Sequence, residues 1–166
     1  GYAFWGEVVR TADRGVRVRV VLDGKVGAAS SGAREVVRRL DGHPRIDIMR
    51  FNPVHLLRPW EWHTLLHDKF ILVDGTYLLL GGRNIGNRYF GPAGYEGGIV
   101  EDRDVLVHGD GTADSVLVST WQYMEKLWRH PATKRYGQAR QPDDAVAAEL
   151  LDRASHHELG HRDLHP

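Results

Sequence analysis

Two short apolar runs joined by an Asp-Gly pair constrain the fold of this chain more than any other feature. Residues 70–73 (FILV) and 77–80 (YLLL) have the length and composition of buried strands. Asp74 and Gly75 begin the link between them, and an Asp-Gly pair between apolar runs is a strong hairpin signal. The sequence therefore predicts a β-hairpin near the middle of the chain, around which the other elements are arranged.

Segments on both sides of this hairpin alternate between helical and extended patterns. Before it, the spacing of apolar residues predicts a helix over 3–14, a strand over 16–20, a helix capped by Ser31 and ending before 41–44, and a strand over 46–51. After it, we expect a Gly-rich loop, a strand over 105–107 and a helix over 112–129 whose inner side carries Val116, Trp121, Met124 and Trp128. This order predicts a mixed α/β layered domain with a mostly parallel sheet flanked by helices.

The composition changes after residue 137. We expect residues 1–137 to form a single domain, and residues 138–166 to form a helix around 143–158 followed by a His-rich tail. The histidines of the tail are His156, His157, His161 and His165. Although the spacing of His157 and His161 suits a metal-binding pair on a helix, the intervening Gly160 and the terminal position favour accidental surface histidines. We therefore expect no metal site.

Charge and cysteine content limit the possible functions only weakly. The 166 residues include 22 Lys plus Arg and 22 Asp plus Glu, so the formal net charge is zero. Proteins that coat nucleic acid are usually strongly basic, although a neutral chain can still hold a local basic cleft. No cysteine is present, which excludes disulfides. No signal peptide or apolar run of the ~20 residues needed to cross a bilayer is visible, and a leader or anchor before Gly1 stays open.

The residues with the clearest chemical meaning begin just before the hairpin. From His67 to Asn84 the chain reads H-x-K-x4-D-x6-G-G-x-N. His67 and Lys69 are two residues apart at the start of a strand, so we expect both side chains to leave the same face of the sheet. An imidazole nucleophile beside an ammonium group suits a phosphodiester, because the ammonium neutralises the charged non-bridging oxygens.

This pattern resembles the HKD signature of the phospholipase D superfamily over its full length. Residues 81–90 (GGRNIGNRYF) and 102–107 (DRDVLV) look like the bacterial cardiolipin-synthase branch of that superfamily, and the resemblance covers about residues 3–130. It implies the layered fold of the family with one HKD half, and a first strand that would precede Gly1. It also implies a phospholipase-D-like phosphodiesterase or phosphatidyltransferase that works through a phosphohistidine intermediate without metal or other cofactor.

The resemblance assigns catalytic roles to a few residues. It implies that His67 is the nucleophile and that Lys69 and Asn84 bind the phosphate oxygens. In the family a carboxylate further along the chain orients the nucleophilic imidazole. Asp102 is the best match for that carboxylate, because it lies just before the strand over 105–107, and Asp104 is the next candidate.

The remaining motif positions have structural or weaker roles. Asp74 is explained as a hairpin residue. Gly81 and Gly82 form the turn that lets the backbone and the Asn84 amide approach phosphate closely. Gly82 replaces the commoner Ser of the family, so one hydroxyl ligand is lost. Arg83 is either a phosphate contact or a solvated charge.

Enzymes of this family use two HKD motifs, one His attacking and the other protonating the leaving oxygen. This chain contains only one His-x-Lys pair. The resemblance therefore implies a second HKD half as a partner, either a copy in a homodimer or another part of the same protein. A lone chain is expected to be inactive.

The leading interpretation of the substrate is a phospholipid, at the cytoplasmic face or periphery of a bacterial membrane. An aromatic stretch over 51–62 either enters the headgroup boundary or lines a core or dimer contact. The alternative is a metal-independent dimeric nuclease, which would use the arginines but is opposed by the neutral net charge; these are Arg17, Arg19, Arg34, Arg38 and Arg39. A degenerate scaffold half is a third possibility, opposed by the intact motif.

Overall fold

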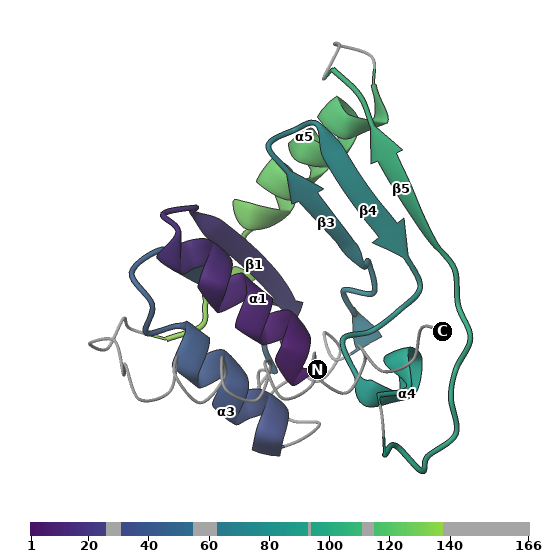
Figure 1. The fold of residues 1–166 in the computed structure, drawn as a ribbon. Helices are drawn as coiled ribbons and strands as arrows, with labels where there is room; N and C mark the ends of the chain where they lie inside the picture. The colour runs from purple at the N-terminus through teal and green to yellow at the C-terminus, as the bar shows by residue number, and fades with distance from the viewer. Residues whose placement is uncertain (26–30, 55–62, 93, 111–114, 138–166) are drawn as a thin grey trace.

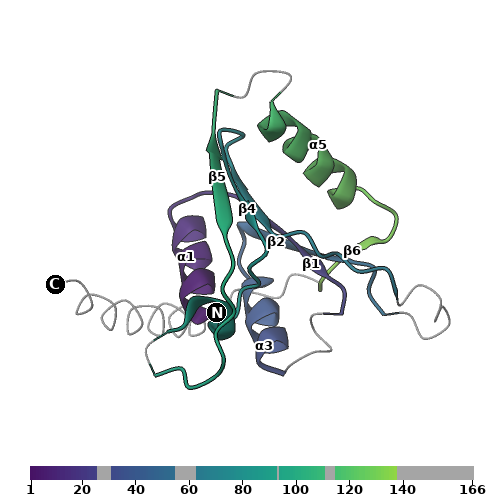
Figure 2. The ribbon, with the colours of Figure 1, turned by 90° about the vertical axis from the view of Figure 1, so that its right-hand side faces the viewer.

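The structure, a computed structural model, describes residues 1–25, 31–54, 63–92, 94–110 and 115–137. Along the chain its elements are α1 (Tyr2–Asp13), β1 (Val18–Asp23), α3 (Ser31–Leu40), β2 (Ile46–Phe51), β3 (Phe70–Val73), β4 (Tyr77–Gly81), α4 (Asn87–Phe90), β5 (Asp104–His108), α5 (Val116–Trp128) and β6 (Thr133–Arg135). The strands form two three-stranded sheets, with orders β1-β2-β6 and β3-β4-β5. Helices α1 and α3 lie on one side of the strands and α5 lies on the other (Figures 1 and 2).

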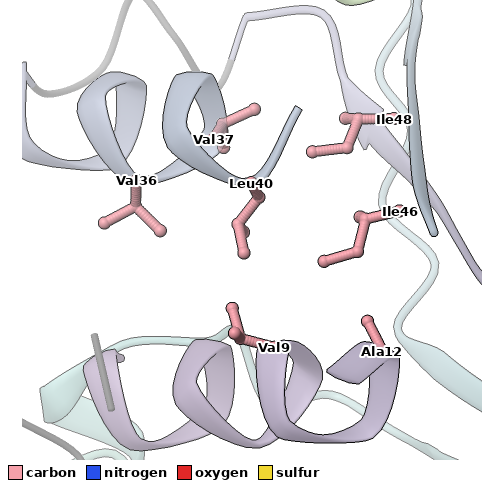
Figure 3. Close-up of a cluster of buried hydrophobic side chains, with 7 residues drawn as sticks. All are labelled: Val9, Ala12, Val36, Val37, Leu40, Ile46 and Ile48. Carbon is pink, nitrogen blue, oxygen red and sulfur yellow. The ribbon is translucent and has the colours of Figure 1, made fainter. Parts of the chain in front are cut away.

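The first sheet holds the main hydrophobic core. Strands β1 and β2 are parallel, with Val18 opposite Ile46, and β6 pairs antiparallel with β2. The apolar face of α1 and that of α3 meet over β2. Their buried side chains form one cluster (Figure 3): Val9, Ala12, Val36, Val37, Leu40, Ile46 and Ile48. A parallel pair needs a crossover between its strands, and α3 supplies it.

The second sheet is the predicted hairpin extended by one strand. Strands β3 and β4 pair antiparallel from Phe70 opposite Leu80 to Val73 opposite Tyr77, and β5 pairs antiparallel with the other edge of β4. The link at 74–75 takes the left-handed backbone conformation at both Asp74 (φ 51°) and Gly75 (φ 68°), as hairpin turns of this kind require. Helix α5 packs against β3 through Phe70 and Tyr123, whose rings lie 6.2 Å apart. The hairpin prediction is confirmed.

The prediction of a mostly parallel sheet was wrong. The mixed α/β architecture is confirmed, but among the described strands only β1 and β2 are parallel, and the other three pairs are antiparallel. The error has a physical reason. A single helical crossover joins two neighbouring strands in the chain, whereas β4 is reached by a tight turn and β5 by a loop, so both lie antiparallel to their neighbours. β6 was not expected from the sequence.

Two predictions of burial were also wrong. The hairpin strands were expected to be buried, but only Leu78 is fully so, and their neighbours on the opposite face are exposed. On α5, Val116 and Trp121 are exposed, whereas Leu117 and Leu127 are buried.

The predicted bounds of α1, α3 and α5 agree with the structure within a few residues. Gly15 follows α1 with φ 101°, which explains the stop. Several predictions fall outside the described residues: the cap by the Ser31 side chain, the aromatic positions 55–62, the helix over 143–158 and the tail histidines. The predicted division at residue 137 is therefore not tested. None of the helices within the described ranges is long and apolar enough to span a bilayer.

Candidate active site

Most residues of the HKD motif meet at one end of the second sheet. Because β3 and β5 both run antiparallel to β4, the start of β3, the end of β4 and the start of β5 lie at the same end. The Gly81 amide donates a hydrogen bond to the Lys69 carbonyl (3.1 Å), and Gly81 pairs with Asp104. Lys69, Gly81 and Asp104 therefore form one row across three strands, and paired residues in a row share a face of the sheet.

Two carboxylates occupy the space beside the Gly-Gly pair. A Cβ on Gly81 would lie 1.9 Å from Oδ1 of Asp104, and a Cβ on Gly82 would lie 2.1 Å from Oδ2 of Asp102. Real Cβ atoms do not approach other atoms so closely, so a side chain at either glycine would displace the aspartate beside it. The two glycines thus leave room for the aspartate side chains that face them.

Arg83 ties the Gly-Gly turn to the start of β5. Its Nη2 donates to the Asp102 carbonyl (2.5 Å), and its Nε lies 3.2 Å from the Asp104 carboxylate, a charge contact without hydrogen-bond geometry. The guanidinium also lies over the Phe90 ring, 5.8 Å from its centroid. Arg83 is therefore held by protein groups and is not simply a solvated charge. Whether it also reaches phosphate stays a prediction.

The side chains of the His-x-Lys pair are open to solvent or only locally bonded. His67 is exposed, and its imidazole makes no hydrogen bond with any residue that the structure describes. The Lys69 ammonium donates to the His67 main-chain carbonyl (2.5 Å). Asp102 and Asp104 lie at the same end of the sheet, but neither contacts the imidazole within the described part of the chain. The orienting role predicted for Asp102 therefore remains a prediction.

Asn84 has a partner that sequence reasoning missed. Its Nδ2 donates to the Tyr89 hydroxyl (2.9 Å), and Tyr89 belongs to the short helix α4 just after the motif. The aromatic residue within the GGRNIGNRYF string was the available signal. The helix turns the chain back so that this hydroxyl meets the amide five residues earlier.

Asp68, the residue between the histidine and the lysine, also has an unexpected partner. The Tyr123 hydroxyl on α5 donates to its Oδ2 (2.5 Å). This hydrogen bond is the main reason why the pKa of Tyr123 is raised to about 12, and burial and the charge of the Asp68 carboxylate act in the same direction. The phenol therefore stays protonated at neutral pH. No sequence signal points to this pair, because 55 residues separate its members.

Asp74 lies at the opposite end of the hairpin from Lys69. The whole length of β3 separates it from the other motif residues, and its backbone is left-handed. Both facts support the structural role predicted for it. In the described ranges there is no cluster of three or more His, Cys, Asp or Glu side chains that could hold a metal ion.

Comparisons with known proteins agree with the resemblance seen in the sequence. The chain matches the family model described as cardiolipin synthase, PLD-like domain, over residues 2–128. It is similar to cardiolipin synthase C of Escherichia coli (strain K12), with 40% identity over 123 residues that cover 69% of this chain and 25% of that protein. It is also similar to a cardiolipin synthase of Alkalihalophilus pseudofirmus, with 31% identity over 121 residues that cover 70% of this chain and 23% of that protein.

A third relative extends the same picture. A cardiolipin synthase of Geobacillus kaustophilus is 30% identical over 122 residues, which cover 70% of this chain and 23% of that protein. No solved structure matches the chain. The chain therefore spans about a quarter of the length of these relatives.

Proposed function

Because the chain belongs to the cardiolipin-synthase group of phospholipase-D-like domains, we propose that it is one catalytic half of an enzyme that transfers or hydrolyses phosphatidyl groups. The observation that carries this proposal is the meeting of three motif segments at one end of the second sheet: residues 67–69, 81–84 and 102–104. Family membership alone would leave the chemistry open, since function depends on the residues of the site.

In the proposed mechanism, the His67 imidazole attacks the phosphorus atom of the phosphodiester. A nitrogen–phosphorus bond forms, the bond to the leaving oxygen breaks, and the leaving oxygen takes a proton from a general acid. Water or an alcohol then gives its proton to the same group, which now acts as the base, and attacks phosphorus while the nitrogen–phosphorus bond breaks. In both steps the Lys69 ammonium neutralises the non-bridging oxygens and the Asn84 amide donates a hydrogen bond to them.

The imidazole also needs a partner on its second nitrogen, and Asp102 or Asp104 would supply it. Asp104 shares a row, and therefore a face, with Lys69, whereas the Asp102 carboxylate lies beside Gly82. Both remain candidates, and the contact would form only when the complete site is assembled. Asp102 is the residue favoured by its place in the family pattern.

The general acid is proposed to come from a second HKD half. One His-x-Lys pair occurs in the 166 residues, so a single copy lacks the second histidine that the mechanism uses. That half is either a second copy in a symmetric dimer or another part of a longer protein. The relatives that the chain matches are about four times longer than the matched region, so they have room for it. We also propose residues 1–137 as the folded unit, since β6 still pairs with the first sheet.

The deciding experiment compares two substrates in EDTA: phosphatidylglycerol vesicles and single-stranded DNA. The variants are wild type, His67→Ala and the matched control His108→Ala, whose exposed histidine lies at the opposite end of the second sheet. In a dimeric sample we expect lipid turnover that His67→Ala lowers by about 1,000-fold or more and His108→Ala leaves unchanged. In a monomeric sample we expect no turnover until a second HKD half is supplied. The molar mass of each sample is measured by light scattering in the same buffer.

Several outcomes would contradict parts of the proposal. DNA cleavage with inert lipid would replace the substrate while keeping the mechanism. Full activity in a proven monomer would remove the need for a second half. Activity that EDTA abolishes and zinc restores would exclude the metal-free mechanism.

A further inference from the structure

His67 lies in a segment that the sheet itself does not hold. Residues 64–69 precede β3 and have no regular secondary structure. Within the described residues, the main chain of the second sheet bonds only to the last of them, because the Gly81 amide donates a hydrogen bond to the Lys69 carbonyl. Side chains from other elements must therefore determine where the nucleophile points.

Two such side chains bind the residues immediately before and after His67. On one side, Oδ2 of Asp23 accepts a hydrogen bond from the Leu66 amide (2.8 Å). On the other side, the Tyr123 hydroxyl donates to the Asp68 carboxylate (2.5 Å). Asp23 ends β1 in the first sheet, and Tyr123 belongs to α5. The two bonds thus attach the residues before and after the histidine to two different elements.

We propose that Asp23 and Tyr123 are positioning residues that together hold the His67 imidazole in its reactive direction. This inference rests on the proposed function. In this proposal neither side chain touches the substrate: Asp23 acts through the main-chain amide of Leu66, and Tyr123 acts through the side chain of Asp68. We call the two hydrogen bonds the His67 clamp.

The Asp23 side of the clamp is itself well supported. Its second oxygen, Oδ1, accepts from the Lys25 amide (2.8 Å), which fixes the rotation of the carboxylate. The Thr64 carbonyl, two residues before Leu66, accepts from both the Asn52 amide group (3.0 Å) and the Lys25 ammonium (3.1 Å). The approach to the nucleophile is therefore tied to the ends of β1 and β2, which belong to the sheet that carries the main hydrophobic core.

The Tyr123 side of the clamp acts from behind the reactive face. Side chains alternate along a strand, and Phe70 meets the Tyr123 ring on the α5 side of the sheet. Asp68 reaches the same tyrosine and so points to that side as well, whereas Lys69 lies in the row of Gly81 and Asp104 on the other face. The Asp68 carboxylate is consequently directed away from phosphate.

The test uses Tyr123→Phe, which keeps the ring on Phe70 and removes only the hydroxyl. The matched control is Tyr77→Phe, whose ring stacks on His108 at the hairpin end of the sheet. In the assay of the full chain, we expect Tyr123→Phe to lower kcat about 3- to 10-fold, because a small misplacement of a reacting group is costly. KM and the unfolding midpoint should stay unchanged, and Tyr77→Phe should behave as wild type.

The Asp23 side is tested by Asp23→Ala, with Asp47→Ala as a carboxylate control elsewhere in the first sheet. We expect Asp23→Ala to lower kcat about 10- to 100-fold. Asp23→Asn keeps one acceptor oxygen for the Leu66 amide, but its NH2 group then faces the Lys25 amide, so it should restore only part of that loss. If Asp23→Ala does not fold, Asp23→Asn and Tyr123→Phe still decide the question.

A readout without turnover separates this inference from the proposed function. Hydrogen exchange of the Leu66 amide and the NMR signals of the His67 ring are measured in each variant. If the clamp acts as a unit, Tyr123→Phe speeds Leu66 exchange and broadens the His67 signals, although Tyr123 touches neither residue. Wild-type behaviour of both probes in Tyr123→Phe would overturn the clamp. An inactive wild type with the expected NMR changes would overturn the function and leave the clamp standing.

Discussion

The two sheets of this protein differ in how well they are covered. In the first sheet, β2 lies under α1 and α3, and Ile46 and Ile48 are almost completely buried. In the second sheet, α5 covers only one face. The opposite face carries a group of apolar side chains that are 37–66% exposed: Ile71, Val73, Tyr77, Leu79 and Leu106. The proposed chemistry lies on the less covered sheet.

This difference indicates a division of labour. Burial of apolar surface is the main favourable term in folding, so most of the stability should come from the first sheet and its helices. The motif end of the second sheet gains its order from ties to that packed region. Asp23 holds the segment before His67, and Arg19 on β1 joins Glu125 on α5 (2.5 Å).

The largest expected effect is on the free energy of unfolding, compared between one substitution in each sheet. Ile48→Ala should lower the free energy of unfolding by about 2–5 kcal/mol, because it leaves a cavity in the packed cluster. Leu106→Ala, at a side chain 66% exposed, should change it by about 0.5 kcal/mol or less. Urea denaturation followed by circular dichroism measures both. Equal losses would show that the open face of the second sheet is buried in solution, for instance by the second half.

A smaller effect is expected at the tie between the two regions. The Arg19 guanidinium lies over the rings of Trp121 (5.4 Å) and Trp128 (5.2 Å) besides its ion pair with Glu125. Arg19→Leu should therefore cost about 1–2 kcal/mol and speed hydrogen exchange in α5 more than in α1. Arg17→Leu is the control, because Arg17 is mostly exposed and, among the residues that the structure describes, forms an ion pair with Asp47 alone. Unchanged exchange in α5 would mean that this helix is held by β3 alone.

The smallest predicted change has the opposite sign and lies in the well-packed region. Asp41 is buried just after α3, and within the described part of the chain its Oδ1 accepts no hydrogen bond. Burial raises the pKa of Asp41, although Arg135 and Arg50 partly offset this. A carboxyl whose pKa is higher in the folded state destabilises the fold once pH rises above its unfolded pKa.

Asp41→Asn should therefore raise the free energy of unfolding at pH 7 by on the order of 1 kcal/mol. The gain should fade as pH falls below about 4, where the carboxyl is protonated in both states. Thermal unfolding from pH 3 to 7 measures the difference. A loss of stability at pH 7 would show that attraction to the two arginines outweighs the burial of the charge.

Much of the architecture was predictable because it depends on local patterns. The Asp74-Gly75 pair fixed the hairpin through turn chemistry, and apolar spacing located the two helices that cover the first sheet. The spacing of the motif also identified the residues that meet at one end of the second sheet. Strand pairing was less predictable, since β6 is three residues long and the direction of β5 depends on the path of a loop.

The partners of the site residues were not predictable, because they are distant in sequence. Tyr123 meets Asp68 across 55 residues and Asp23 meets Leu66 across 43. Only the fold brings them together. The prediction of burial on α5 was wrong for a related reason, because the inner side of this helix depends on how it packs on β3. Leu117 and Leu127 are buried, whereas Val116 and Trp121 are exposed.

The packing of Asp102 against Gly82 has a consequence for how this site can change. A serine at position 82 would restore the hydroxyl that the commoner form of the motif carries, but its Cβ would enter the space of the Asp102 carboxylate. The two positions are therefore not independent variables for protein engineering or for divergence between sequences. A Gly82→Ser change would therefore have to be accompanied by a movement of the Asp102 carboxylate or by a substitution at 102. Libraries that vary the motif should randomise the pair together.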